Sequence, residues 1–346
     1  MDTYIILLNW NGWRDTIECL ESLFRLANDN FKVVVCDNAS SDDSMQRIKA
    51  WAQGEILVSA LNAELDKFSS PAVRKPLGYE EISHDLIRHS EINRDARLIL
   101  IQIGSNLGFA GGNNIGLRFA LQDLNCKFCW LLNTDTVVAP DALTALRSTV
   151  NQNPEIGICG SLNLSYYSPR QVQALGGKRY NYWTSRAYTV PTITVDNLPA
   201  SAGKFDYVNG ASMFVTRQFL ETVGLMEESY FLYFEELDWA MRAKGHFLLG
   251  YAPGSVIYHK EGAQAGSSPD RMKRSILSDR FLTRNRILFT RRYLPWALPT
   301  ALMTTTLAAT YRLLRGDPKR AIVMFTSMLD GLSYHARTAE TSCRQK

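Results

Sequence analysis

The sequence predicts an α/β fold with a mostly parallel central sheet flanked by helices, because short apolar runs alternate with segments of helical periodicity. Four runs have the length and composition of buried strands: Tyr4–Leu8, Lys32–Cys36, Leu98–Ile103 and Phe128–Leu132. Ile56–Val58 is a shorter candidate for a further strand. Alternating strands and helices are typical of a three-layer parallel sheet, and 346 residues allow one large domain or two.

Polar segments follow these runs directly. Asn9–Gly12, Asp37–Ser41 and Asn133–Asp135 come after the first, second and last run, and Asn106–Asn114 opens a helix that ends near Leu124. Ligands bind where the strands of such sheets end, so we expect these segments to meet at one edge. The glycines of Asn106–Asn114 fit neither the dinucleotide-binding nor the P-loop spacing, which disfavours both classes.

Composition divides the chain into regions. Residues 1–265 carry the alternation of strands and helices. Residues 62–97 interrupt it with polar and charged residues, Pro71 and Pro76, and we interpret them as an inserted loop or lid. Residues 266–346 are basic and partly apolar, which predicts a helical C-terminal extension.

Charge is concentrated in this extension. The net charge of the chain is +4, but residues 271–346 hold 15 Lys and Arg against 4 Asp and Glu. The uncharged run Leu294–Tyr311 contains two prolines and five threonines, which disfavours a membrane-spanning helix. We expect it to contact an anionic membrane surface, with a helical cap on the α/β domain as the alternative, and we expect no nucleic-acid partner.

The N-terminus and the cysteines bear on the cellular compartment. Tyr4–Leu8 is too short for a secretory signal, and no basic leader precedes it. Cys126 and Cys129 form a CxxC without a second pair, so a buried or reduced pair is favoured over a zinc or redox site. We therefore expect a cytoplasmic protein, peripheral on the cytoplasmic face of the inner membrane.

Two acidic segments suit group-transfer chemistry. Asp135 is a candidate ligand for Mg²⁺ or Mn²⁺, with Asn133 as its neutral neighbour, although turns also use these residues. Glu235 and Glu236 lie in an aromatic run, where one carboxyl can gain a raised pKa and act as a general base. Asp238 is a candidate for orienting an acceptor or for a structural role. The alternative for Glu235, Glu236 and Asp238 is that they form the acidic first turn of a helix.

The ordered set of motifs resembles family 2 glycosyltransferases of the GT-A fold, especially their bacterial rhamnosyltransferase-like branch. The matching segments are Asn9–Gly12, Asp37–Asp42, Asn106–Asn114, Leu132–Asp135, Asn209–Met213 and Tyr233–Arg242. Arg284–Tyr293 is similar to the start of the family's C-terminal extension. The resemblance covers residues 1–262 apart from the insertion, and it implies a GT-A catalytic domain over residues 1–265.

The resemblance also implies roles for individual residues. Asp37 would recognise the pyrimidine ring, Asp135 stands where the family has its DxD-type metal motif, and His259 matches a metal-binding histidine of some relatives. Glu236 matches the catalytic base, with Glu235 and Asp238 as neighbouring catalytic candidates. The implied nucleotide-sugar contacts are Asn9, Trp10, Asn11, Asp37, Asn38, Asn106, Gly108, Phe109, Gly111, Asn113, Asn133 and Asp135. The chain departs from the pattern in having Asn133 for the first DxD acid and Glu in place of Asp as the base.

The activity that the resemblance implies is metal-dependent, inverting sugar transfer. The expected donor is a dTDP- or UDP-linked sugar, with L-rhamnose as the expected sugar. The acceptor would be a saccharide or a polyprenyl-linked saccharide in bacterial cell-surface polysaccharide synthesis, such as O-antigen assembly. Two alternatives stay open: a sugar nucleotidyltransferase, which would release pyrophosphate, and a non-catalytic sugar-nucleotide-binding subunit whose metal site has decayed.

Overall fold

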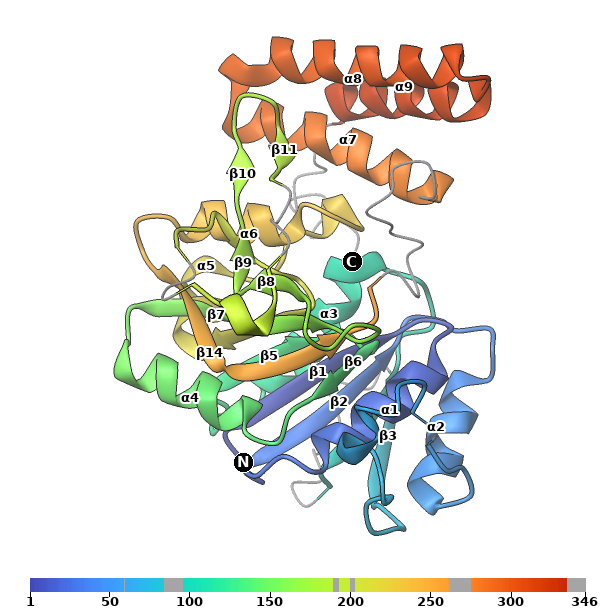
Figure 1. Cartoon of the computed structure of the whole chain (residues 1–346), viewed down its shortest axis with the longest axis vertical. Helices are drawn as coiled ribbons and strands as arrows, with labels where there is room; N and C mark the ends of the chain where they lie inside the picture. Colours follow the sequence, from blue (N-terminus) through green and yellow to red (C-terminus); the bar gives the residue numbers. More distant parts are fainter. Residues whose placement is uncertain (59, 84–95, 189–192, 200–202, 262–274, 335–346) are drawn as a thin grey trace, which may run out of the picture.

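A single large sheet organises the fold. The computed structural model describes residues 1–58, 60–83, 96–188, 193–199, 203–261 and 275–334. Helices cover both faces of the sheet, and a further group of helices from the C-terminal part of the chain lies across one end of the molecule (Figure 1). The prediction of an α/β fold with a helical C-terminal region is confirmed.

One half of the sheet is parallel and has the strand order β5-β1-β2-β4-β3. Its strands are β1 (Thr3–Asn9), β2 (Phe31–Asp37), β3 (Tyr79–Ser83), β4 (Leu98–Gln102) and β5 (Phe128–Leu132). The register aligns Asn9 with Asp37, and Asp37 with Gln102. The polar residues that follow β1 and β2 therefore meet at the same edge, as the sequence predicts.

The other half of the sheet is mixed. β13 runs antiparallel to both β5 and β7, and β14 runs parallel to β7 and antiparallel to β6. The strands are β6 (Thr136–Val138), β7 (Ile156–Ser165), β8 (Val172–Leu175), β9 (Gly177–Lys178), β12 (Tyr207–Val208), β13 (Ser212–Thr216) and β14 (Leu248–His259). β6 begins directly after Asp135 and pairs its first residue with His259, which brings the two together.

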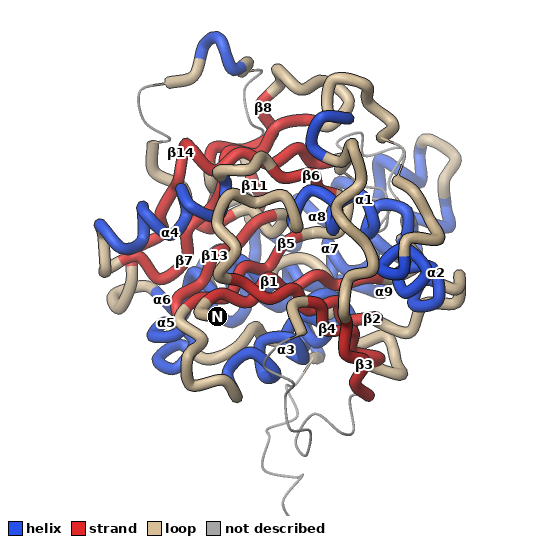
Figure 2. Tube along the Cα trace, turned by 90° about the horizontal axis from the view of Figure 1, so that it is seen from below, coloured by secondary structure: helices blue, strands red, loops and turns tan. Residues whose placement is uncertain are grey.

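Alternation along the central strands produces two cores. Ile5 and Leu7 face a core that includes Trp51, and Tyr4 and Ile6 face one that includes Trp239. The helices are α1 (Trp13–Leu23), α2 (Ser44–Gln53), α3 (Gly108–Leu121), α4 (Ala142–Gln152), α5 (Arg217–Val223) and α6 (Glu235–Ala243), with short 3₁₀ turns at Asp66–Phe68, Val195–Asn197 and Glu228–Tyr230. Viewed from below, α3, α5 and α6 lie together on one side of the strands (Figure 2).

The C-terminal helices pack on the α/β domain. They are α7 (Ile276–Tyr293), α8 (Leu298–Leu314) and α9 (Pro318–Ser333), with a 3₁₀ turn at Pro295–Ala297 before α8. Phe289 and Leu288 of α7 join Leu237 of α6 and Tyr230 in one buried cluster. A hairpin of β10 (Tyr180–Asn181) and β11 (Arg186–Ala187) rises toward these helices (Figure 1). Across the part of the chain that the structure describes, no helix combines the length and apolar character that crossing a bilayer requires.

Several sequence expectations need correction. Ile56–Val58 is not a strand; the position beside β4 belongs to β3, which lies within the segment interpreted as a loop or lid. β3 escaped prediction because Tyr79-Glu-Glu-Ile-Ser is an edge strand with only one buried residue. Residues 84–95 of that segment lie outside the described residues, as do 266–274 and 335–346 of the extension. Cys126 and Cys129 are both buried and free, with sulfurs 3.8 Å apart, as expected for a buried reduced pair.

Candidate active site

Side chains tie the ends of β1 and β2 together. Asn9 donates through Nδ2 to Asp37 Oδ1 at 2.8 Å and to Ser40 Oγ at 3.0 Å, and it accepts from Thr16 Oγ1 at 2.8 Å. The backbone N–H of Ser40 donates to the other Asp37 oxygen at 3.0 Å. Asn11 joins the same network through Ser40. This network fixes the Asp37 carboxylate at the strand edge predicted to hold the nucleoside.

Asn38 connects this edge to the start of α3. Its Oδ1 accepts from the N–H of Leu107 at 2.9 Å, and its Nδ2 donates to Asn106 Oδ1 at 3.0 Å. Gly108 begins α3 with φ +73°, and a Cβ there would lie 2.3 Å from the carbonyl oxygen of Phe231. Only glycine meets both conditions, so the carbonyl of Phe231 can accept from Phe109 N–H at 2.6 Å.

Two residues predicted to contact the nucleotide sugar have packing roles in α3. A Cβ on Gly111 would lie 2.8 Å from Leu107 Cβ, and Asn113 Nδ2 donates to the carbonyl oxygen of Phe109 at 2.9 Å. α3 also starts at Gly108, so the glycine-rich segment forms the first turns of the helix as well as the loop before it.

Asp135 and His259 form a buried pair at the junction of β6 and β14. His259 Nε2 lies 3.2 Å from Asp135 Oδ1, and its Nδ1 lies 3.2 Å from Gln173 Oε1. Burial opposes the charge on each, but mutual attraction prevails: it holds the pKa of Asp135 below its usual range and raises the pKa of His259.

The pair offers the donor set of a small divalent-cation site. Among the described residues there is no cluster of three or more His, Cys, Asp or Glu side chains placed to hold a metal ion. A carboxylate and an imidazole at the edge of a cleft nevertheless suit Mg²⁺ or Mn²⁺, which commonly takes few protein ligands and completes its shell with phosphate oxygens and water. Gln173 orients the imidazole from behind. Asp135 and His259 therefore fit the predicted cation.

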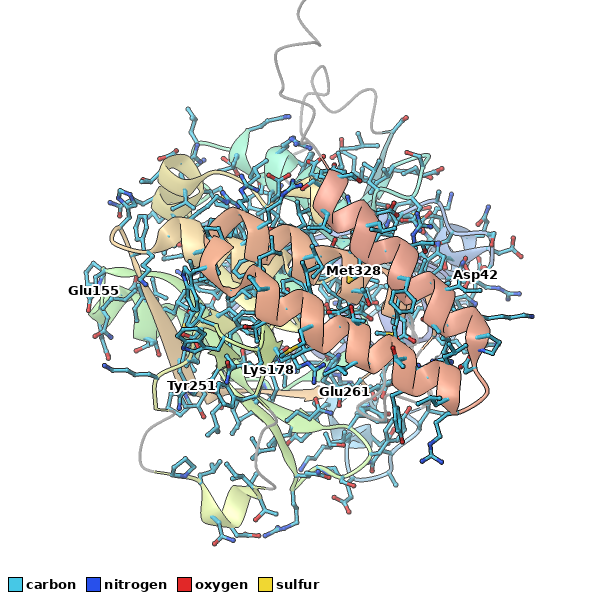
Figure 3. All side chains as sticks on the ribbon, turned by 90° about the horizontal axis from the view of Figure 1, so that it is seen from above. Asp42, Glu155, Lys178, Tyr251, Glu261 and Met328 are labelled. Carbon is cyan, nitrogen blue, oxygen red and sulfur yellow. The ribbon has the colours of Figure 1, made fainter. Side chains whose placement is uncertain are left out.

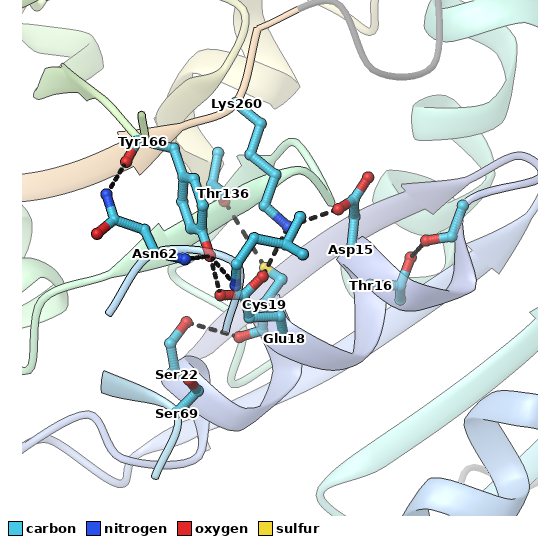
Figure 4. A network of polar contacts seen from close by, with 12 residues as sticks. Asp15, Thr16, Glu18, Cys19, Ser22, Asn62, Ser69, Thr136, Tyr166 and Lys260 are labelled. Atoms are coloured by element: carbon cyan, nitrogen blue, oxygen red, sulfur yellow. Dashed lines mark hydrogen bonds and ion pairs between the residues drawn. The ribbon is translucent and has the colours of Figure 1, made fainter. Parts of the chain in front are cut away.

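Lys260, the residue after His259, belongs to a buried ionic network (Figure 4). Lys260 donates to Asp15 at 2.5 Å and to Glu18 at 2.6 Å, and Tyr166 OH donates to Glu18 at 2.6 Å. The backbone N–H of Lys260 also donates to the carbonyl oxygen of Asp135 at 2.9 Å. Because Lys260 follows His259 directly, the network fixes both members of the pair to α1.

Glu235 and Glu236 begin α6 at the opposite wall. Burial raises the pKa of both, and the charge of Glu236 raises that of Glu235 further, to well above its usual range. Glu235 is 2% exposed, and its Oε2 has no hydrogen-bond partner. Glu236 is partly exposed, and its carboxylate rests against Gly210, where a Cβ would lie 2.2 Å from Oε1. This arrangement leaves Glu236 the more readily ionised of the two.

The loop before α6 is held in a strained conformation. Phe231, Tyr233 and Phe234 have φ values of +64°, +69° and +78°, which bulky residues rarely adopt. Asn285 of α7 lies near three carbonyl oxygens of the loop: Nδ2 is 2.8 Å from that of Tyr230, 2.8 Å from that of Leu232 and 3.0 Å from that of Tyr233. The C-terminal helices thus help to hold the loop that delivers Glu235 and Glu236.

Asp238 does not reach the cleft, and its placement as a catalytic residue is corrected. It is fully buried and accepts hydrogen bonds from Arg242 Nε at 2.7 Å and Tyr293 OH at 2.7 Å. Tyr230 OH donates to it at 3.2 Å. The acid therefore links α6 to α7. Its spacing of two residues from Glu236 places it on the opposite side of the helix from that residue.

One cleft of about 1130 Å³ brings the two walls together. Ten predicted site residues line it: Trp10, Asn38, Asn106, Gly108, Phe109, Asn133, Asp135, Glu235, Glu236 and His259. Asn9, Asp37, Gly111, Asn113 and Asp238 are buried and do not line the cleft, and Asn11 is exposed and does not line it either. The described residues of the 62–97 segment are also absent from it.

Sequence reasoning missed several lining residues. Lys178, Arg186 and Gln173 come from short strands, and Arg286 comes from α7. Gln173, Lys178 and Arg186 lie in a region without clear periodicity, so the sequence did not predict that they line a cleft. The Arg284–Tyr293 segment resembles the start of the family's C-terminal extension, but only the structure shows that this segment reaches the cleft.

The sheet is mostly parallel, and its polar strand ends line one cleft opposite a wall of acidic residues. This arrangement is the one expected of the GT-A fold. Residues 79–203 match the sequence family described as glycosyl transferase family 2. This match lies within the predicted catalytic domain and supports the resemblance to family 2 glycosyltransferases.

Two curated relatives are similar over part of their length. The low-salt glycan biosynthesis hexosyltransferase Agl10 of Haloferax volcanii is 31% identical over 150 residues, which cover 42% of this chain and 45% of that protein. The N-acetylglucosaminyl-diphospho-decaprenol L-rhamnosyltransferase of Mycobacterium tuberculosis is 26% identical over 205 residues, which cover 54% of this chain and 66% of that protein. The chain thus matches about half to two thirds of the length of these relatives.

A solved structure supports the fold. The mannosyltransferase PcManGT from Pyrobaculum calidifontis, in complex with GDP-Man and Mn²⁺, aligns with a TM-score of 0.52 and 15% identity over 96% of this chain and 87% of that one. At this identity the likeness concerns the fold alone, and it confirms the predicted GT-A architecture.

Proposed function

We propose that the chain is an inverting, metal-dependent glycosyltransferase that uses a nucleotide-diphosphate sugar. The observation that carries this proposal is that the Asp135–His259 pair and the acids Glu235 and Glu236 line one cleft. The family 2 domain and the relatives, whose names describe a hexosyltransferase and a rhamnosyltransferase, support the same class of reaction.

In this mechanism Glu236 accepts the proton of an acceptor hydroxyl. The hydroxyl oxygen then bonds to the anomeric carbon of the donor, and the bond from that carbon to the diphosphate oxygen breaks with inversion. Asp135 and His259 would hold Mg²⁺ or Mn²⁺, which supplies charge neutralisation for the departing diphosphate. Asp37, Asn38 and their neighbours would position the nucleoside.

We also propose a class of donor and a class of acceptor. A dTDP- or UDP-linked sugar is the proposed donor, with L-rhamnose favoured by the second relative's name. The acceptor would be a saccharide or a lipid-linked saccharide of cell-surface polysaccharide synthesis. The proposed location is cytoplasmic, at a membrane surface.

Surface association rests on the outward face of the C-terminal helices. Trp183 and Trp296 are 66% and 51% exposed, and their rings contact each other with centroids 4.5 Å apart. Apolar side chains of α8 and α9 are exposed on the same layer: Met303, Leu307, Tyr311, Leu313, Leu314, Ile322 and Leu329. Together with the basic composition of residues 271–346, this face suits an anionic lipid surface.

A donor screen tests the activity. The full chain is incubated with dTDP-, UDP- and GDP-sugars, with and without EDTA, and release of nucleoside diphosphate is measured. We expect release from one donor class and its loss with EDTA. Release of pyrophosphate would indicate the nucleotidyltransferase alternative, and no release from any donor with any acceptor would favour a binding subunit.

A further inference from the structure

The cleft extends well beyond the proposed transfer centre. Past Glu236 it continues between the β10–β11 hairpin and the C-terminal helices. Its lining there is largely apolar and comes from α7, α8 and α9: Leu277, Phe281, Leu282, Leu307, Ala308, Tyr311 and Met324. Seen from above, the helical layer lies over this part of the molecule, with Lys178 and Glu261 beside it (Figure 3).

Cations line the same stretch of the cleft. Arg186 of the hairpin donates through Nη2 to the carbonyl oxygen of Thr304 at 3.4 Å, and Arg286 of α7 donates through Nη1 to Thr305 Oγ1 at 3.4 Å. Both guanidinium groups therefore lie along α8. Lys178 also lines the cleft, and its positive charge opposes the upward shift in the pKa of Glu236 and of His259.

Most carboxylates of the cleft lie at the transfer centre, away from the arginines beside α8. Asp135, Glu235 and Glu236 lie at the transfer centre, and Glu261 lies close enough to influence His259. Asp279 is the lining acid on the helical side, and it pairs with Arg312 and Arg320, each at 3.1 Å. Among the described residues, the α8 side of the cleft thus holds three arginines, Arg186, Arg286 and Arg312, and one carboxylate, that of Asp279, beside apolar side chains.

We propose that this half of the cleft binds an acceptor in which a phosphate or diphosphate joins a sugar to an apolar chain. Arg186 and Arg286 contact the phosphate oxygens, Leu307 and Tyr311 contact the first part of the chain, and the sugar hydroxyl reaches Glu236. The inference rests on the proposed glycosyltransferase function and assigns its acceptor subsite to residues outside the family motifs.

The chemistry of the lining favours this acceptor over others. A guanidinium matches the geometry of a phosphate oxygen pair, which a neutral saccharide does not offer. A second nucleotide would satisfy the arginines but not the apolar wall. Leu307 and Tyr311 are 62% and 54% exposed while lining the cleft, so they stand at its mouth on the face proposed to meet lipid.

Binding of a short analogue tests the subsite without turnover. Farnesyl diphosphate is titrated into the full chain saturated with nucleoside diphosphate and Mn²⁺, and compared with farnesol and with inorganic pyrophosphate. We expect farnesyl diphosphate to bind at least tenfold more tightly than either. Equal affinity for farnesol, or for pyrophosphate, or displacement of farnesyl diphosphate by the nucleotide, would overturn the proposal.

Variants locate the binding. Arg186→Gln and Arg286→Gln should each weaken farnesyl diphosphate binding on the order of tenfold, as expected for the loss of a charge-assisted hydrogen bond. Leu307→Ser should weaken it too, whereas its control Leu314→Ser, an exposed α8 position away from the cleft, should not. Lys319→Gln is the exposed charge control. Unchanged binding in both arginine variants, or equal loss in the controls, would refute the subsite.

The two proposals fail separately. If farnesyl diphosphate binds as expected but no donor releases nucleoside diphosphate, the glycosyltransferase activity is wrong and the anionic lipid site remains. If donor turnover occurs but the arginine variants bind farnesyl diphosphate like the unmodified chain, the activity stands and the acceptor subsite is wrong.

Discussion

At the scale of the residue, the position of Glu236 depends on the absence of a side chain at residue 210. The Glu236 carboxylate rests on Gly210, and a Cβ there would come within 2.2 Å of Oε1. Its neighbour Glu235 is more deeply buried and holds its proton to higher pH. The surroundings thus raise the pKa of Glu235 further than that of Glu236.

Gly210→Ala should displace the proposed base. A small misplacement of a reacting group costs roughly a hundredfold in rate, so we expect kcat to fall by about that factor while nucleotide binding is kept. Steady-state kinetics with a calorimetric nucleotide titration checks this. Gly78→Ala, at a glycine with no atom within 4 Å of the added Cβ, is the control. Normal kcat in Gly210→Ala would argue against Glu236.

The raised pKa of Glu236 predicts a rate that increases with pH, and the raised pKa of Glu235 predicts a stability that decreases with pH. The rate should fall as pH drops through the raised pKa of Glu236, because only the ionised carboxylate accepts a proton. For stability, a carboxyl with a raised folded-state pKa costs nothing below the unfolded value and destabilises the protein above the folded value. Glu235→Gln should therefore raise the melting temperature at pH 8.

Near pH 4 the melting temperature of Glu235→Gln should be close to that of the unmodified chain, because the protonated Glu235 side chain and the Gln side chain are both neutral there. Melting curves across this range check the sign. A Glu235→Gln protein that is less stable than the unmodified chain at pH 8 would mean that Glu235 is ionised and paired in solution.

At the scale of the element, α7 belongs to the candidate active site as much as to the extension. Asn285 is fully buried and lies within 3.0 Å of three carbonyl oxygens of the loop before α6. Arg284 beside it donates to the carbonyl of Ser229 at 2.9 Å. The strain of the three left-handed aromatic residues is sustained by these contacts from α7.

Asn285→Ala should release that loop. Leaving buried carbonyls without a donor costs about 1–3 kcal/mol, so the free energy of unfolding should fall by that amount. The rate should fall more than the stability loss alone explains, because Glu236 follows the loop. Denaturant unfolding and kcat measured on the folded fraction separate the two. A stable variant with full activity would show that the loop keeps its conformation without α7.

Strand and helix periodicity predicted the parallel half of the sheet well, because strands buried on both faces, such as Phe31–Asp37, read as continuous apolar runs. It failed where burial is slight, as at the edge strand Tyr79–Ser83. The polar strand ends predicted Asp135 and Asn38 in the cleft. Nothing in the local sequence predicted Arg186 or Asn285, whose positions depend on packing between distant segments.

At the scale of the whole molecule, the C-terminal helices close one side of the cleft and present an apolar, aromatic outer face. Removing the extension entirely would therefore disturb the active-site loop as well as any membrane contact. Substitutions of Leu314, Ile322 and Leu329 isolate the surface function, because these three exposed residues of α8 and α9 do not line the cleft.

Replacing Leu314, Ile322 and Leu329 together with serine should weaken binding to vesicles that contain anionic lipid. Each buried CH₂ contributes about 0.8 kcal/mol, so the loss should exceed tenfold. Sedimentation with anionic and neutral vesicles measures it, and the rate on a water-soluble acceptor is the control. Unchanged sedimentation would remove this face from the membrane contact.

Sugar transfer as proposed depends most on Glu236 and Asp135 acting across one cleft. The direct measurement is the rate of nucleoside-diphosphate release from the preferred donor by Glu236→Gln and Asp135→Asn, each verified as folded. We expect Glu236→Gln to lose at least about a hundredfold in rate while still binding nucleotide, and Asp135→Asn to lose its response to Mn²⁺. Rates equal to that of the unmodified chain in both variants would contradict it.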